Sequence, residues 1–290
     1  QAAMSNTPAP ERLAGEAIGR DRRALPLRAE ARRQLRRPRT LWAGAILFAL
    51  PLIVVAAFAL GDGGDPGGAL FSDLATSGAA NFAVFMLLVA AELLILILAA
   101  LFVGDSVPAE ASWGSLRYLL TAPVPRARLL TSKLIIGLLT SAVALVAFVS
   151  WSLVVGGLAY GWAALTIPLA GTLDWPTVLG HLALASGYVF VSVLPFAALA
   201  FWVGVAVDTP LGAVGAAVLA AIVSSILDAL DALGDWRRAL PNHYSRGWIE
   251  LFQVEPDLSE MLHGVAWCAL YTTVFLALAY RHFARKDVLS

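Results

Sequence analysis

The chain has 290 residues, of which 59% are hydrophobic and only 14% are charged. A typical soluble domain is about 45–50% apolar and about 25% charged, so this composition excludes a disordered chain, a nucleic-acid-binding protein and an ordinary soluble enzyme. The 20 basic residues balance the 20 acidic ones, and the single cysteine excludes an internal disulfide or a multi-cysteine metal site. We therefore expect an integral membrane protein of the all-α class.

The first 40 residues contain ten arginines and precede the first long apolar run. We expect residues 1–24 to form a flexible tail, in which residues 1–3 before Met4 are an expression remnant. Leu27, Ala31 and Leu35 recur at helical spacing among the arginines, which predicts a short interfacial helix lying flat on the membrane. Alternatively, the basic segment only sets the topology and attracts anionic lipid.

Six apolar runs are long enough to cross about 30 Å of hydrocarbon as helices. They are residues 41–60, 81–103, 134–158, 181–203, 209–227 and 264–281. Residues 159–180 contain an apolar stretch that is too short to span. Three alternatives remain open for it: it lies in the interface, it re-enters the membrane, or it extends the third helix.

Glu92 lies at the midpoint of the second run. A carboxylate at that depth costs about 2.5–3.5 kcal/mol or more. No Lys or Arg lies in the core of another predicted span. We expect Glu92 to be protonated, to bond to a neighbouring Ser or Thr, or to face a water-filled path. It is our candidate for the translocation path, and the alternative is an acid that only ties helices together.

The loop between the second and third runs predicts a surface helix. Pro108 suits a first helical turn, Leu116, Leu119 and Leu120 form an apolar stripe, and Pro123 ends the element. The sequence therefore predicts a short amphipathic helix over about residues 105–122, of a kind that suits docking onto a soluble partner.

Small residues recur every four positions in the fifth run, at Gly212, Ala216 and Ala220. Such a stripe lets two helices approach closely. One interpretation is packing within the same subunit, and the other is a homodimer seam.

Residues 228–263 carry seven acids interleaved with aromatic and aliphatic side chains. This pattern predicts one or two short helices on the outer membrane face, with tryptophans at headgroup depth. His243 and His263 lack the spacing of zinc ligands, so we expect solvated histidines and no metal site.

The charges separate by side once the six spans are placed. The two termini and the 104–133 loop hold 17 of the 20 basic residues, whereas the opposite side holds 3 basic and 11 acidic residues. The positive-inside rule then places both termini in the cytoplasm. Glu92 is the one charge left inside the membrane.

The loop motif resembles the signature of the ABC-2 type exporter permeases. It consists of Glu110, then Gly114-Ser115-Leu116, then Leu119-Leu120, Pro123, Arg126 and Lys133. The tail at residues 283–288 is also similar, and the resemblance covers about residues 25–290. Two departures are Ser115, where the family more often has Thr, and the apolar lead-in of residues 107–109.

The resemblance implies that residues 25–290 form one ABC-2 type transmembrane domain of an exporter in the bacterial plasma membrane. Two separate ATPase subunits bind ATP and Mg, and two permeases pair as a homodimer or a heterodimer. This chain itself then has no cofactor, catalytic residue or nucleic-acid partner, and contacts membrane lipid. The implied coupling residues are Glu110, Gly114, Ser115, Leu116, Arg117, Leu120, Pro123 and Arg126. The alternative is a helix that merely connects two spans.

The sequence contains no G-x-x-x-x-G-K-[ST] phosphate loop, and the glycine-rich run at Gly61–Gly68 lacks the lysine. ATP hydrolysis would therefore come from another chain. The alternative function is a secondary transporter driven by an ion gradient, although such proteins often show an internal repeat and several intramembrane ionisable residues. An intramembrane enzyme is disfavoured because no span carries a His pair or a Ser/His pair.

Overall fold

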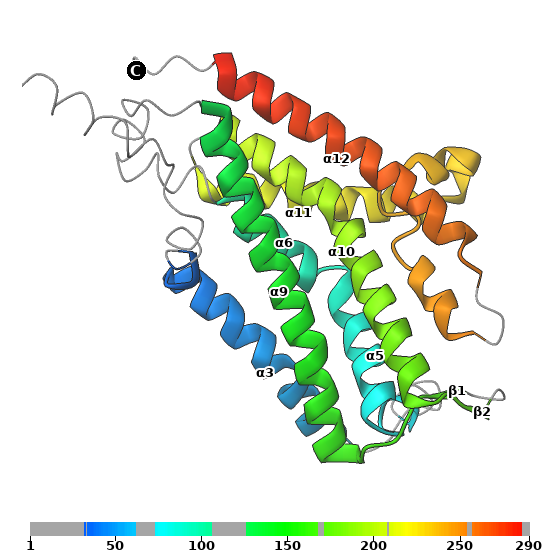
Figure 1. Cartoon of the computed structure of the whole chain (residues 1–290). Helices are drawn as coiled ribbons and strands as arrows, with labels where there is room; N and C mark the ends of the chain where they lie inside the picture. The colour runs from blue at the N-terminus through cyan, green and yellow to red at the C-terminus, as the bar shows by residue number, and fades with distance from the viewer. Residues whose placement is uncertain are drawn as a thin grey trace, which may run out of the picture.

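The computed structural model describes residues 32, 34–61, 73–105, 126–167, 171–207, 209–253 and 257–285. These residues are mostly helical, which confirms the all-α class (Figure 1). The long helices are α3 (Pro38–Leu60), α5 (Ala79–Ala91), α6 (Leu94–Gly104), α9 (Arg126–Tyr160), α10 (Trp175–Ala206), α11 (Pro210–Asp228) and α12 (Ser259–Arg285).

Five of these helices are each long and apolar enough to cross a membrane: α3, α9, α10, α11 and α12. Helices α5 and α6 pass the same test only together, and they are bent by 57° at the residues between them. The described chain thus has five candidate spans, or six if the bent pair counts as one. Five of the predicted spans each coincide with one helix, whereas the second coincides with the bent pair of α5 and α6.

Helix α10 lies at the centre of the molecule. It contacts α12, α6, α11 and α9, while α9 also packs against α3, α5 and α6. In α10, 61% of the most apolar window is buried, against 17% in α3 and in α12. The faces that α3, α11 and α12 turn outward are rich in Leu, Ile and Val, as expected for helices that contact lipid or another subunit.

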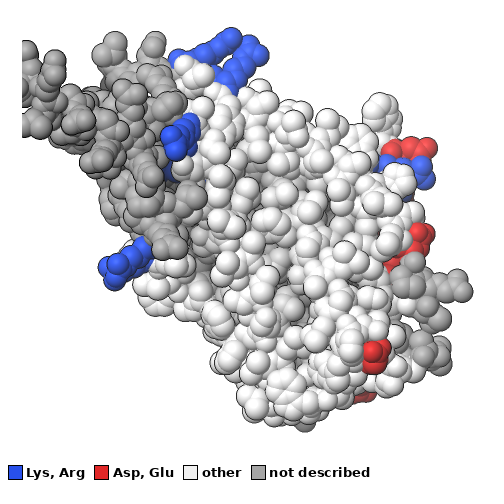
Figure 2. Space-filling model, in the orientation of Figure 1, with Lys and Arg blue, Asp and Glu red and all other residues white. Residues whose placement is uncertain are grey.

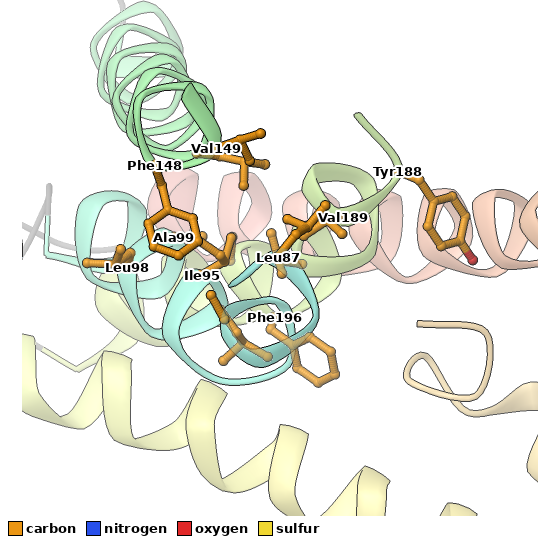
Figure 3. Close-up of a cluster of buried hydrophobic side chains, with 14 of the residues drawn as sticks. Leu87, Ile95, Leu98, Ala99, Phe148, Val149, Tyr188, Val189 and Phe196 are labelled. Carbon is orange, nitrogen blue, oxygen red and sulfur yellow. The ribbon is translucent and has the colours of Figure 1, made fainter. Parts of the chain in front are cut away.

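The core is built where α5, α6, α9 and α10 meet (Figure 3). Leu87 of α5, Phe148 of α9 and Val189 of α10 belong to the same buried cluster there. A small residue allows the close approach of α6 to α9, because a Cβ atom at Gly137 would lie 2.9 Å from the carbonyl oxygen of Phe102. Close van der Waals packing of this kind drives helix association in lipid, where the hydrophobic effect between helices is absent.

Charged residues gather at two ends of the molecule, with an uncharged belt between them (Figure 2). What we call the basic end comprises the beginnings of α3, α9 and α11 and the ends of α6, α10 and α12 (Figure 1). Its described basic residues are Arg32, Arg36, Arg37, Arg39, Arg128, Lys133, Arg281 and Arg285. What we call the acidic end comprises the beginning of α5, residues 161–175 and residues 228–260. This separation matches a chain that crosses a membrane several times.

Residues 159–180 form neither a further span nor a re-entrant segment where the structure describes them. Helix α9 ends at Tyr160, and β1 (Thr166–Ile167) pairs antiparallel with β2 (Gly171–Thr172) before α10 begins. Asn81 in the first turn of α5 holds this hairpin in place. Its Nδ2 donates to the carbonyl of Thr166 and its Oδ1 accepts from the Thr166 amide, both at 2.9 Å.

The connection between α11 and α12 contains two short 3-10 helices, η1 (Asp231–Ala239) and η2 (Gly247–Phe252). The prediction of two short helical elements is confirmed. The expected headgroup-level position of both tryptophans is wrong for Trp248, which is 1% exposed because it packs inside the protein, whereas Trp236 is 80% exposed.

Candidate functional site at the break in the second span

The break between α5 and α6 places a charged side chain between two apolar helices that are bent by 57° relative to each other. Glu92 and Leu93 connect the two helices, and Leu93 has a non-helical backbone with φ −122° and ψ −53°. Neither proline nor glycine is present at this point, so the usual sequence signals of a kink are missing.

Glu92 forms an ion pair with Arg246, in which the Arg246 Nε donates to Glu92 Oε1. Arg246 lies in the connection between η1 and η2, 154 positions along the chain. The hydrogen bond to Glu92 raises the pKa of Arg246, although burial acts in the opposite direction. None of the three expected environments of Glu92 included a basic partner from a connecting segment.

This chain does not enclose the ion pair by itself. The Glu92 side chain is 43% exposed and that of Arg246 is 67% exposed. Charges facing hydrocarbon are costly and normally line a water-filled space or meet a partner. The exposed sides of both side chains are therefore open to contact from outside this chain.

A small cavity with a mixed polar and apolar lining adjoins the ion pair. Its volume of about 10 Å³ is close to the space needed by one water molecule. The cavity is lined by Leu88, Ala91 and Glu92 at the end of α5, Leu96 of α6, Ser192, Val193 and Phe196 of α10, and Asn242, Ser245, Arg246 and Trp248 of the connection. Three segments of the chain thus present polar atoms to one point.

Hydrogen bonds anchor the connection to the middle of α10 and to the end of α11. The Tyr188 hydroxyl donates to the Tyr244 carbonyl at 2.6 Å. Tyr188 is 13 residues into α10, or about 20 Å along its axis at 1.5 Å per residue. The connection therefore reaches well along α10 instead of covering only its first turn.

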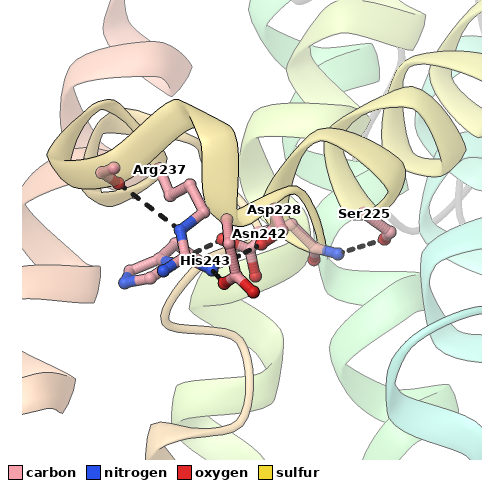
Figure 4. A network of polar contacts seen from close by, with 7 residues as sticks. Ser225, Asp228, Arg237, Asn242 and His243 are labelled. Carbon is pink, nitrogen blue, oxygen red and sulfur yellow. Dashed lines mark hydrogen bonds and ion pairs between the residues drawn. The ribbon is translucent and has the colours of Figure 1, made fainter.

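The second anchor is a polar network at the end of α11 (Figure 4). Asn242 donates to the Ser225 hydroxyl at 2.6 Å, and His243 Nδ1 lies 2.5 Å from Asp228 Oδ1. Arg237 bonds the Asp228 carbonyl at 3.3 Å and the Asp231 carboxylate at 3.0 Å. These bonds hold Arg246, three residues after His243, where it can reach Glu92.

The histidines expected to be solvated both have protein contacts. His243 pairs with Asp228, and His263 Nδ1 lies 2.7 Å from the Ser259 carbonyl. Within the described ranges, no group of three or more His, Cys, Asp or Glu side chains has a geometry that could hold a metal ion.

The predicted coupling residues Glu110, Gly114, Ser115, Leu116, Arg117, Leu120 and Pro123 lie outside the described residues. Arg126 is the first residue of α9, and its side chain is likewise not described. The structure therefore leaves this set as a prediction. Of the expected interfacial helix before the first span, only residue 32 and residues 34–37 are described.

The small-residue stripe of α11 is divided between two faces. Ala213, Ala217 and Ala221 are buried inside the chain, where α11 packs against α10 and α6. The neighbouring candidate seam remains more accessible, since Gly212 is exposed and Ala216 and Ala220 are half-buried. The predicted stripe of Gly212, Ala216 and Ala220 therefore lies beside the packed face of α11, and both of its interpretations stay predictions.

A second polar cluster at the basic end was missed by sequence reasoning. Asp105, directly after α6, is almost fully buried and pairs with Arg39 at 2.8 Å and Arg37 at 3.7 Å. Gln34 Nε2 donates to the carbonyl of Phe102 at 3.3 Å. These contacts tie the start of the 106–125 loop to the start of α3. The one sequence signal was a carboxylate at the end of an apolar run, on the side to which the charge count assigns most of the arginines.

The fold and the charge separation define a helical multi-pass membrane protein. Residues 52–289 match the family described as "Protein of unknown function (DUF2705)", and the chain belongs to that family. A comparison with curated proteins gave no match. The family description assigns no activity, so a function must be inferred from the residues of this chain.

Proposed function

We propose that this chain is the transmembrane permease subunit of an ATP-binding cassette exporter in the bacterial plasma membrane. Two copies of a separate ATPase subunit would supply ATP hydrolysis, and two permeases would pair around the path. The observation that carries the proposal is the motif from Glu110 to Arg126. It falls in the connection between α6 and α9, and both helices meet that connection at the basic end.

The finer topology follows from the same proposal. Helices α5 and α6 together count as the second of six spans, and both termini and the 106–125 loop lie in the cytoplasm. The excess of arginine at the basic end supports this orientation through the positive-inside rule. An interfacial helix would precede α3, a coupling helix would occupy the loop, and η1 and η2 would belong to the outer side.

ATP hydrolysis would be coupled to transport by helices that move as rigid bodies. Closure of two ATPases on nucleotide would move the docked loop, and α6 and α9 would move with it. Because the second span is broken at Glu92, α6 can change its angle while α5 stays packed on α9. Such a change would alter the Glu92–Arg246 contact, which we place on the translocation path.

Co-purification tests the proposed ATPase partner. The full chain, extracted from its native membrane in mild detergent, should retain an ATPase with Walker motifs, and vanadate should inhibit the activity of the complex in nanodiscs. Leu116→Asp should release the ATPase because it places a charge in the apolar stripe. Leu35→Asp, an exposed leucine at the same end, serves as the control. A chain that never associates with such an ATPase contradicts the proposal.

The role of the ion pair is tested by exchanging its charges. Glu92→Arg and Arg246→Glu should each reduce transport by an order of magnitude or more, because two like charges then face each other at the break. The double variant should recover most of the lost activity, since opposite charges are restored. Equal losses in the single and double variants would remove the pair from the path.

A secondary transporter driven by an ion gradient is the alternative, and the broken span favours it. Interrupted helices with an ionisable residue near the break are typical of that class. The two functions differ in their energy source. Vanadate would stop only the exporter, whereas collapse of the proton gradient by an ionophore would stop only the secondary transporter.

A further inference from the structure

A basic pocket lies between the last turns of α10 and α12, outside the site described above. Its lining consists of Trp202 of α10 with Leu278, Arg281, His282 and Arg285 of α12, and its volume is about 350 Å³. The four α12 residues fall at positions that share one helix face, since they are three, four and seven apart. Trp202 therefore supplies an apolar wall of the pocket, and Arg281, His282 and Arg285 supply three basic side chains.

The basic side chains of this pocket are available for a ligand. Arg281, His282 and Arg285 are all exposed. In the part of the chain that the structure describes, no carboxylate pairs with Arg281 or Arg285, whereas Arg39, Arg237 and Arg238 each have an acidic partner. Arginines in the last turn of a helix also interact favourably with its carbonyl end. That interaction does not by itself explain a hollow between two helices.

The apolar side of the pocket is fixed in position. The Trp202 ring stacks on Phe275 with centroids 6.1 Å apart and an angle of 15° between the rings. On the same stretch of α12, the hydroxyl groups of Tyr280 and Thr131 lie 2.7 Å apart and join α12 to α9. A tryptophan at a helix end is typical of the membrane interface, where its ring lies at headgroup level.

We propose that this pocket binds the phosphate of an anionic phospholipid headgroup. The two guanidinium groups suit the phosphate oxygens, because arginine presents paired N–H donors. Trp202 and Leu278 contact the glycerol and upper acyl chain. Basic pockets between membrane helices are known to hold such headgroups. The inference requires only that the chain spans a membrane, and it extends beyond the proposed export function.

The binding is tested on the full chain by native mass spectrometry with phosphatidylglycerol and phosphatidylcholine as probes. The chain should retain one phosphatidylglycerol in preference to phosphatidylcholine. Arg281→Gln with Arg285→Gln should weaken retention by roughly 30-fold, the value expected for two arginines near an anionic surface. The matched control is Arg36→Gln with Arg128→Gln, which removes the same charge from exposed residues that do not line the pocket, and it should weaken retention much less because neither residue contacts the bound phosphate.

Two further arms make the result decisive. Arg281→Lys with Arg285→Lys keeps the charge and should retain more lipid than the glutamine pair, which separates lost binding from lost folding. Inorganic phosphate at equal concentration should not displace the lipid. Equal losses in the pocket and control variants, equal retention of the two lipids, or displacement by inorganic phosphate would each overturn the proposal.

Discussion

Of the described glycines, Gly264 in α12 leaves the least room for a side chain. A Cβ atom added there would lie 2.1 Å from the Tyr188 hydroxyl and 2.8 Å from the Tyr244 Cβ. The same hydroxyl donates to the Tyr244 carbonyl, so it cannot turn away without losing that bond. Only a glycine at this position lets α12, α10 and the connection before η2 meet.

Gly264→Ala should therefore lower the free energy of unfolding by about 1–3 kcal/mol, the usual cost of overpacking. Thermal unfolding in detergent measures the change. Gly187→Ala in α10 is the matched control, since a Cβ atom there meets no neighbour within 4 Å and alanine favours a helix over glycine. If both substitutions stabilise the protein equally, the contact with Tyr188 does not limit the packing.

The ion pair of Glu92 marks the limit of sequence reasoning at the residue scale. The cost of placing a carboxylate within an apolar run singled out Glu92 as unusual. Its partner was not predictable, because Arg246 lies 154 positions away in a segment whose path depends on the contacts of Tyr188, Trp248 and His243. Local patterns carry no information about such a path.

At the scale of elements, the helices were predictable and their interruptions were not. Long apolar runs are a strong signal of membrane helices. Every predicted span therefore falls on one helix or, for the second span, on the pair of α5 and α6. The break at Glu92 lacks proline and glycine, while Pro51 and Pro195 lie within helices that the structure leaves continuous. Tertiary contacts, such as those of α6 with α10 and α11, decide where a helix bends.

The side chain of Asn81 bonds the hairpin after α9 to the first turn of α5. Asn81→Ala removes both hydrogen bonds to Thr166 and leaves its amide and carbonyl without these partners, which costs about 1–3 kcal/mol. We expect faster hydrogen exchange in residues 163–173, with α9 and α10 unchanged. Asn242→Ala, which loses one bond to an exposed hydroxyl, is the control. Uniformly faster exchange would show instead that the whole fold had weakened.

Asp105 links α6 to α3 and should make stability depend on pH. Burial raises the pKa of Asp105 above its usual 3.8, although Arg39 and Arg37 act to lower it. The folded state therefore binds the proton more tightly than the unfolded state. The contribution of Asp105 to stability should be fully present below about pH 4 and be lost as the pH rises from 3.8 through the raised value.

Asp105→Asn removes the titrating group and should flatten this slope, as measured by unfolding temperatures across acidic pH. Asp231→Asn is the control, because its exposed pair with Arg237 contributes only about 0–1 kcal/mol. A slope that persists in Asp105→Asn would assign the pH dependence to another group.

Labelling of introduced cysteines can determine how many times the whole chain crosses the membrane. Cysteines replacing Arg36, Arg128 and Trp236 would report from before α3, from the start of α9 and from η1, all at exposed side chains. With six crossings, the first two label from one side and Trp236→Cys from the other. With five, Arg36→Cys and Trp236→Cys share a side and Arg128→Cys is opposite.

The ion pair between Arg39 and Asp105 favours six crossings, since it brings the start of α3 and the end of α6 together. A membrane-impermeant maleimide added before and after permeabilisation makes the measurement. The unsubstituted chain is a suitable background, because its one cysteine, Cys268, is buried and should stay unlabelled. Rapid labelling of Cys268 would show that α12 is more open than described.

The unequal lengths of the helices have a consequence for the surrounding bilayer. At 1.5 Å per residue, the 35 residues of α9 extend about 52 Å and the 32 of α10 about 48 Å, whereas the 19 of α11 extend about 28 Å. Hydrocarbon of about 30 Å fits α11 closely and leaves some 20 Å of the longer helices to be taken up by tilt or projection. Lipids around one circumference therefore meet walls of different height, and a thicker bilayer strains the α11 side first. Membrane thickness thus acts as a mechanical load on this protein, applied unevenly around its perimeter.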